Sequence, residues 1–145
     1  MENQNIAINS IQDLINYINK SNITSDNSKK DLAIAIIKQN PEIIKNSEDL
    51  SNFINELGFE GDIYKRYLAI AIIEKNPEII KDINDSSKLS EFIVTQLQIA
   101  YDERKRDLAI AIIEKKPETI KNINDSSKLS EFIVTQLQIT DGDYK

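Results

Sequence analysis

The sequence predicts an all-α protein made of tandem helical repeats. We expect about three and a half units of 36–40 residues, stacked as a short α-solenoid or a compact helical array. Residues 68–99 and 108–139 differ at only three of 32 positions, and a shorter copy begins at Leu32. Apolar residues recur at helical spacing in every copy, and the chain has only three glycines and three prolines. These observations disfavour a β architecture with many turns.

The predicted domain is a single helical-repeat unit that covers residues 1–145, because a chain of this size is usually one domain. No repeat can bury its own apolar face, so each one must stack on its neighbours. The expected parts are a terminal helix at 10–22, repeats at 26–59, 62–99 and 102–139, and a tail at 140–145.

Each repeat is expected to open with a long helix. Asp26, Asp62 and Asp102 lie about one and a half turns before the block LAIAII, where an aspartate can accept the free N–H groups of a helix start. A strand is rejected because the block runs on into Glu, Lys and Gln without turn residues. Since this helix is apolar almost all round, we expect it to be buried on several sides.

A proline follows each long helix, at positions 41, 77 and 117. Proline suits the first position of a helix, so a short second helix is expected there, with Asn40 and Asn76 as its N-caps. A kinked continuation of the first helix is the alternative. Because Ile79 becomes Thr119 in the last copy, that position is expected to be half exposed.

The third piece of each repeat is expected to be an amphipathic helix. Asp85 and the serines after it are capping residues, and the spacing of the apolar residues that follow gives one buried face. An aromatic residue recurs on that face and is interpreted as core rather than as part of a ligand site. Its four occurrences are Tyr17, Phe53, Phe92 and Phe132. Gly58 and Phe59 resemble a helix C-cap with its hydrophobic contact.

The composition indicates a protein that is not an enzyme. The chain has no cysteine and no histidine, which excludes a thiolate nucleophile, an imidazole base and a Cys/His zinc site. Acidic pairs such as Glu74 and Glu78 recur in near-identical copies, whereas an active site seldom occurs in tandem duplicates. We therefore expect no catalytic residue, no metal and no cofactor.

Basic residues recur just before each apolar block, and they could align as a stripe in a stacked array. Solvated charge is the ordinary interpretation, but these cations lie in first helical turns, where the helix dipole disfavours positive charge. The hypothesis is that this basic stripe binds an acidic or phosphate-bearing partner protein. Its members are Lys29, Lys30, Lys65, Arg66, Arg104, Lys105 and Arg106.

The last predicted helix, 128–139, matches the internal helix 88–99 at every position. Terminal repeats usually carry a modified polar face, so an unchanged one could expose apolar surface for self-association or for a partner helix. A recent duplication explains the same identity equally well. The residues of this hypothetical end face are Leu129, Phe132, Ile133 and Leu137.

Together these features predict a non-enzymatic protein–protein interaction module. The alternative is a small phage or intracellular-bacterial effector that binds and inhibits a host factor, favoured by the many Ile, Lys and Asn residues typical of an AT-rich genome. The net charge of −6 argues against nucleic acid as the main partner. No apolar run is long enough to span a membrane, and no classical signal is visible. A cytoplasmic location is expected, with export by another route or delivery into a host cell left open.

Overall fold

The computed structural model describes residues 8–120, 128 and 131–138. Within these ranges the protein is entirely helical and contains no strand. The α-helices are α1 (Ile11–Lys20), α2 (Asp26–Gln39), α3 (Ser47–Glu56), α4 (Asp62–Lys75), α5 (Ser86–Ser90) and α6 (Asp102–Lys115). Two π-helices also occur, one at Glu91–Gln96 that continues α5 and one at Phe132–Gln136. The prediction of an all-α protein is confirmed.

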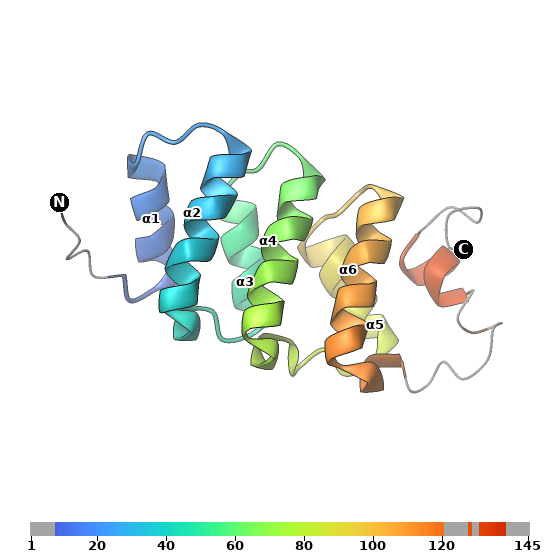
Figure 1. Cartoon of the computed structure of the whole chain (residues 1–145). Coiled ribbons are helices and arrows are strands. Elements are labelled where there is room, and N and C mark those ends of the chain that lie inside the picture. The colour runs from blue at the N-terminus through green and yellow to red at the C-terminus, as the bar shows by residue number, and fades with distance from the viewer. Residues whose placement is uncertain (1–7, 121–127, 129–130, 139–145) are drawn as a thin grey trace.

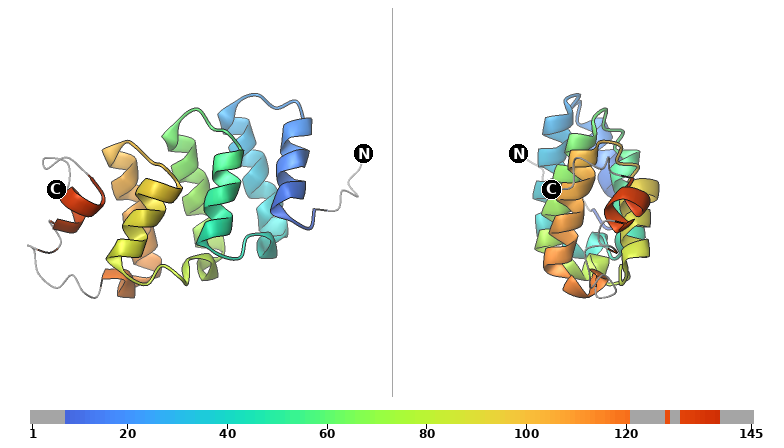
Figure 2. Two further views of the ribbon diagram at one scale, coloured as in Figure 1. Left: turned by 180° about the vertical axis from the view of Figure 1, so that it is seen from behind. Right: turned by 90° about the vertical axis from the view of Figure 1, so that its right-hand side faces the viewer.

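The helices form two layers. Helices α2, α4 and α6 lie side by side in one layer, with α4 in contact with both of its neighbours (Figure 1). The second layer holds α1, α3 and α5 with its π-helical continuation, as the view from behind shows (Figure 2). Buried apolar side chains from both layers make one continuous core, which includes Phe53, Phe92 and Leu108. In the described part of the chain, no helix is both long and apolar enough to cross a membrane.

The long helices α2, α4 and α6 cover the three LAIAII blocks, as expected. Their burial is less complete than the sequence suggested. Leu108 and Ile112 of α6 have no exposed surface, whereas Ile110 is 48% exposed. The expectation of burial on several sides is wrong for this outer side, because only one layer of helices packs behind α6.

Short 3-10 helices follow the prolines, at Pro41–Ile43, Pro77–Ile80 and Pro117–Ile120. The preceding residues Asn40 and Asn76 have non-helical backbones, so a kinked continuation does not occur. Neither asparagine caps its short helix with its side chain, contrary to expectation. The Asn40 side chain instead donates from Nδ2 to the carbonyl of Ile36, 3.2 Å away, at the end of α2.

The expectation that the Ile79/Thr119 position is half exposed is also wrong. Ile79 is 0% exposed and Thr119 is 1% exposed. A threonine is accommodated there because its hydroxyl donates a 3.0 Å hydrogen bond to the carbonyl of Lys116. Burial of a polar group carries little cost when a hydrogen bond satisfies it.

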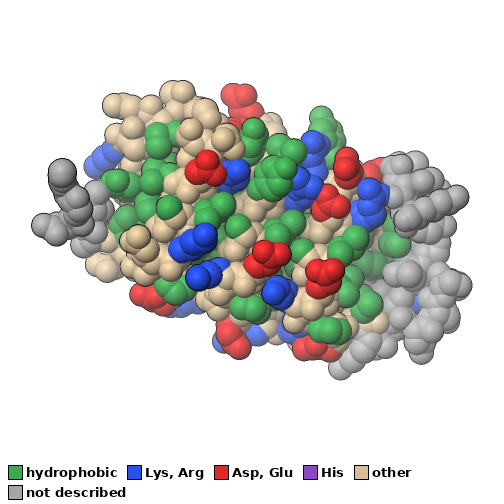
Figure 3. All heavy atoms as spheres, viewed as in Figure 1, with side chains coloured by type: hydrophobic (Ala, Val, Ile, Leu, Met, Phe, Trp, Pro, Cys, Tyr) green, Lys and Arg blue, Asp and Glu red, His purple; other side chains and the backbone are tan. Residues whose placement is uncertain are grey.

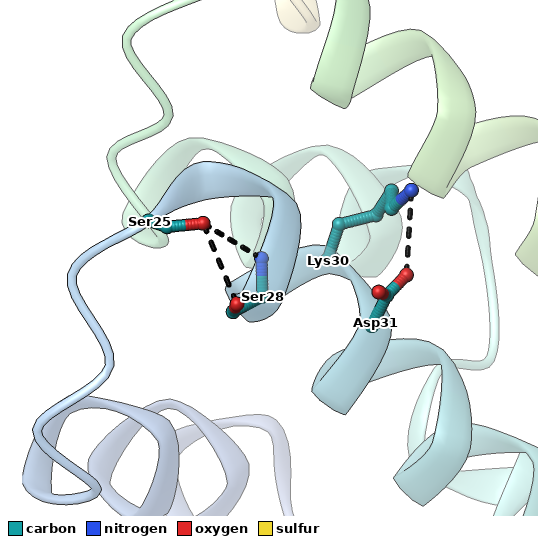
Figure 4. Close-up of polar contacts among 4 residues, drawn as sticks. All are labelled: Ser25, Ser28, Lys30 and Asp31. Atoms are coloured by element: carbon teal, nitrogen blue, oxygen red, sulfur yellow. Dashed lines mark hydrogen bonds and ion pairs between the residues drawn. The ribbon is translucent and has the colours of Figure 1, made fainter.

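The N-cap predicted at Asp85 is confirmed, because its side chain accepts from the backbone N–H of Lys88 at 2.8 Å. Ser10, which was not predicted as a cap, accepts from the backbone N–H of Asp13 at 3.1 Å at the start of α1. The capping role expected of Asp26 and Asp62 is not observed. The N-cap of α2 is Ser25, whose hydroxyl accepts from the N–H of Ser28 (Figure 4). The N-cap position of α4 is Gly61, so no side chain caps the start of this helix.

The chain reverses direction after α1, α3 and the π-helix at Glu91–Gln96, each time through a residue of positive φ. Gly58 has φ +69°, Asn22 has φ 63° and Gln98 has φ 58°. Gln138, the last residue that the structure describes, has φ 60°. This confirms the expected C-cap at Gly58, whose following residue Phe59 is buried. A positive φ is costly for most residues but not for glycine.

Replacing Gly58 with alanine is expected to lower the free energy of unfolding by about 1 kcal/mol. The cause is backbone strain alone, because a Cβ at this position would meet no atom within 4 Å. Urea unfolding measures the loss. Gly58→Asn is the control and should lose less, since asparagine tolerates this conformation and occupies the equivalent position 22. A Gly58→Ala variant as stable as the wild type would contradict this account.

Candidate functional site

Three lysines of the predicted basic stripe point into the protein rather than along its surface. Lys29 Nζ donates to the carbonyl of Leu57 at 3.2 Å, and Lys65 Nζ donates to that of Leu97 at 2.9 Å. Lys105 Nζ donates to the carbonyl of Gln138 at 3.2 Å, and its side chain is only 5% exposed. Each lysine thus satisfies a carbonyl at the C-terminal end of the inner-layer helix that follows it, where positive charge is favoured.

Aspartates three residues earlier hold the same turns from the other side. Asp26 Oδ2 accepts from the backbone N–H of Glu60 at 2.8 Å. Asp62 Oδ2 accepts from those of Ala100 and Tyr101, at 2.6 and 3.3 Å. We call the pairs Asp26/Lys29 and Asp62/Lys65 the turn clamps, because each binds both sides of one turn. The spacing Asp-x-x-Lys occurs at 26–29, 62–65 and 102–105, so this signal was visible in the sequence.

The remaining stripe residues are also engaged within the molecule. Lys30 Nζ forms an ion pair with Asp31 Oδ1 at 3.3 Å (Figure 4). Lys30 Nζ also lies over the ring of Tyr67, 5.1 Å from its centroid. Arg66 forms an ion pair with Asp107 and stacks on Tyr67, with its guanidinium carbon 4.4 Å from the ring centroid.

Arg104 stacks in the same way on Tyr101, with its guanidinium carbon 4.6 Å from the ring centroid. Arg106 also makes a contact within the protein. The structure therefore does not present these residues as one row of free cations, because carbonyls, carboxylates and aromatic rings within the chain already bind them.

The hypothetical end face is not an exposed apolar surface either. Phe132 and Leu137 are buried, and Ile133 is partly buried against the core. Leu129 lies outside the described residues. The face expected to be open packs inward, because the π-helix Phe132–Gln136 turns these side chains toward the preceding helices, where it contacts α5.

A groove runs between α4 and α6 on the outer face of the protein. We call it the α4–α6 groove, a cavity of about 380 Å³. It is lined by Arg66, Tyr67, Ile70, Glu74, Asp107, Ile110, Ala111 and Glu114. On each helix the lining residues recur at i, i+3 and i+7, so they form one continuous stripe along each wall. This groove was not predicted from the sequence.

The floor of the α4–α6 groove is apolar. Ile110 is 48% exposed and Tyr67 is 45% exposed, two of the few large apolar side chains with that much free surface among the described residues. Hydrophobic side chains lie over α4 and α6 on this face, with both acidic and basic side chains among them (Figure 3). A concave apolar surface with charged edges is typical of sites that bind another molecule.

The two ends of the α4–α6 groove differ in charge. The Arg66–Asp107 pair closes one end, and its charges neutralise each other. Glu74 and Glu114 line the other end, and both side chains are exposed. Among the described residues neither glutamate forms an ion pair. This end therefore carries two negative charges that have no ion-pair partner in the described part of the chain.

A second hollow lies in the inner layer, between α3 and α5, and it is polar. Ser47 donates from its hydroxyl to Asp82 Oδ2 at 2.7 Å, and Asn55 Nδ2 donates to the carbonyl of Gln96 at 2.7 Å. The first bond joins α3 to the segment before α5, and the second joins α3 to the end of the π-helix at Glu91–Gln96. The side-chain oxygen Oε1 of Gln96, which also lines this hollow, is buried without a hydrogen-bond partner.

Side chains that could bind a metal ion do not cluster in the described ranges. No group of three or more acidic residues there is placed to hold a metal ion. Fold and site thus define a helical domain whose distinctive surface feature is the α4–α6 groove.

Comparison with known families assigns this helical domain more closely. A family model described as the FeoB cytosolic helical domain matches residues 42–127, more than half of the chain. The protein belongs to the family of FeoB cytosolic helical domains. No curated protein and no solved structure matches the chain.

Proposed function

We propose that this chain is a non-enzymatic protein–protein interaction module, built as a short α-solenoid of stacked helical repeats. The α4–α6 groove is the observation that carries the proposal. It combines exposed apolar surface at Ile110 and Tyr67 with charged ends, and no catalytic set accompanies it in the described residues. Such a surface stabilises a complex by burying apolar area.

Recurring contacts support the solenoid part of the proposal. The two turn clamps bind equivalent turns, and residues of positive φ recur at 22, 58, 98 and 138. Arg66 of α4 forms an ion pair with Asp107 of α6. Lys30, at the equivalent position of α2, lies over the ring of Tyr67, which has in α4 the position that Asp107 has in α6. Equivalent residues that join successive units are typical of repeat proteins. A cytoplasmic location is part of the proposal, supported by the word cytosolic in the family description.

Photo-cross-linking in the native cell tests the interaction. A photoreactive amino acid replaces Ile110 in the full chain, and a second variant carries it at Asn84, an exposed residue outside the groove. We expect a protein adduct that forms from position 110 and is absent from position 84. Identical adducts from both positions, or none from position 110, would contradict the proposed binding surface.

A further inference from the structure

We propose that the α4–α6 groove binds a basic amphipathic segment of a partner protein. The segment would place an aliphatic side chain on Ile110 and a lysine or arginine beside Glu74 and Glu114. This inference rests on the proposed function and specifies the chemistry of the partner.

The apolar part of the segment follows from the floor of the groove. Ile70, Ile110 and Ala111 form a floor bordered by Tyr67, and the cavity of about 380 Å³ can receive a side chain such as leucine or methionine. Burying exposed apolar surface on both partners supplies the driving force. The stripes on the two walls span about two helical turns, so the site suits a short helix laid along the groove.

The basic part follows from a difference between two equivalent helix boundaries, α2–α4 and α4–α6. In the chain, Lys38 of α2 stands at the position that Glu74 has in α4 and Glu114 has in α6. The boundary between α2 and α4 therefore pairs a lysine with a glutamate. The boundary between α4 and α6 instead brings two glutamates to one groove. Lys75 and Lys115 follow these glutamates but do not line the groove.

The spacing fixes where the cation must lie. Glu114 is four residues after Ile110 on the same helix wall, which is about one turn, or about 6 Å along the axis. A cation within one turn of the aliphatic anchor would therefore lie between the two carboxylates. The opposite end offers no such attraction, because Arg66 and Asp107 neutralise each other there.

Selection from a phage-displayed library tests the inference. Random peptides of about three helical turns are selected on the immobilised full chain, and the same selection is made on the Glu74→Gln/Glu114→Gln variant. We expect peptides with an aliphatic residue and a lysine or arginine within four positions, enriched only on the wild type. Peptides enriched without a basic residue would overturn this inference and leave the proposed function standing. No enrichment at all, or wild-type dimerisation through the groove, would overturn both.

Binding measurements then quantify the role of the two glutamates. By fluorescence anisotropy, we expect the most enriched peptide to bind the Glu74→Gln/Glu114→Gln variant about 3- to 10-fold more weakly than the wild type. The matched control is Glu78→Gln/Glu118→Gln, which removes the same charge from exposed glutamates outside the groove. The control should bind like the wild type. Equal weakening in both variants would show a general effect of net charge and overturn the inference.

Discussion

Replacing Phe92 with alanine is expected to lower the free energy of unfolding by about 3–5 kcal/mol. Phe92 is 1% exposed and lies where the inner-layer helix after α5 packs against both α3 and α6. The substitution removes a large buried ring and leaves a cavity that the surrounding helices can only partly fill. Because small domains are stable by about 5–15 kcal/mol, this loss would be a large fraction of the total.

Urea unfolding followed by circular dichroism measures the effect. Phe92→Leu is the first control and should lose much less, because most of the buried volume remains. Tyr17→Ala is the second control, since Tyr17 has the equivalent position in α1 but is only partly buried. A Phe92→Ala variant no less stable than Tyr17→Ala would contradict the packing described for the core.

Removing one turn clamp, with Asp62→Ala/Lys65→Ala, is expected to lower the free energy of unfolding by about 2–4 kcal/mol. Asp62 accepts from two backbone N–H groups, and Lys65 donates to the partly buried carbonyl of Leu97. Without these side chains the carbonyl of Leu97 keeps its burial but loses its charged partner. The effect therefore exceeds the few tenths of a kcal/mol typical of a surface lysine.

The single variants and a surface control separate this effect from a change in net charge. Lys75→Ala removes an exposed lysine of the same helix and should change stability by no more than about 0.5 kcal/mol. If Lys65→Ala behaves like Lys75→Ala under urea unfolding, the clamp has no energetic role. In that case Lys65 would be available as a free cation, as the hypothesis of a basic stripe requires.

The helical architecture was predictable because it depends on local patterns. The apolar spacing around LAIAII, the proline after each long helix and the cap at Asp85 each act within a few residues. The recurring aromatic residue was correctly assigned to the core at three of its four positions, since Phe53, Phe92 and Phe132 are buried, whereas Tyr17 is only partly buried. All of these features follow from the 3.6-residue period of the α-helix and from the burial of apolar side chains.

The candidate site was not predictable in the same way, because it depends on contacts between distant segments. The sequence could not show that Lys65 reaches a carbonyl 32 residues later, so its charge was assigned to the surface. Nor could it show that α6 has helices on only one side of its layer, which leaves Ile110 exposed. The Asp-x-x-Lys spacing was present three times, and its repetition was the one available sign that these charges bind within the protein.

Backbone amide chemical shifts, recorded by NMR on the labelled full chain during titration with the selected peptide, test the central claim most directly. The account predicts saturable shifts concentrated at Tyr67, Ile70, Ile110 and Ala111, the floor and border of the α4–α6 groove. Shifts centred instead on the polar hollow at Ser47, Asp82 and Gln96 would contradict it. The same contradiction would follow from binding that leaves the amides of α4 and α6 unchanged.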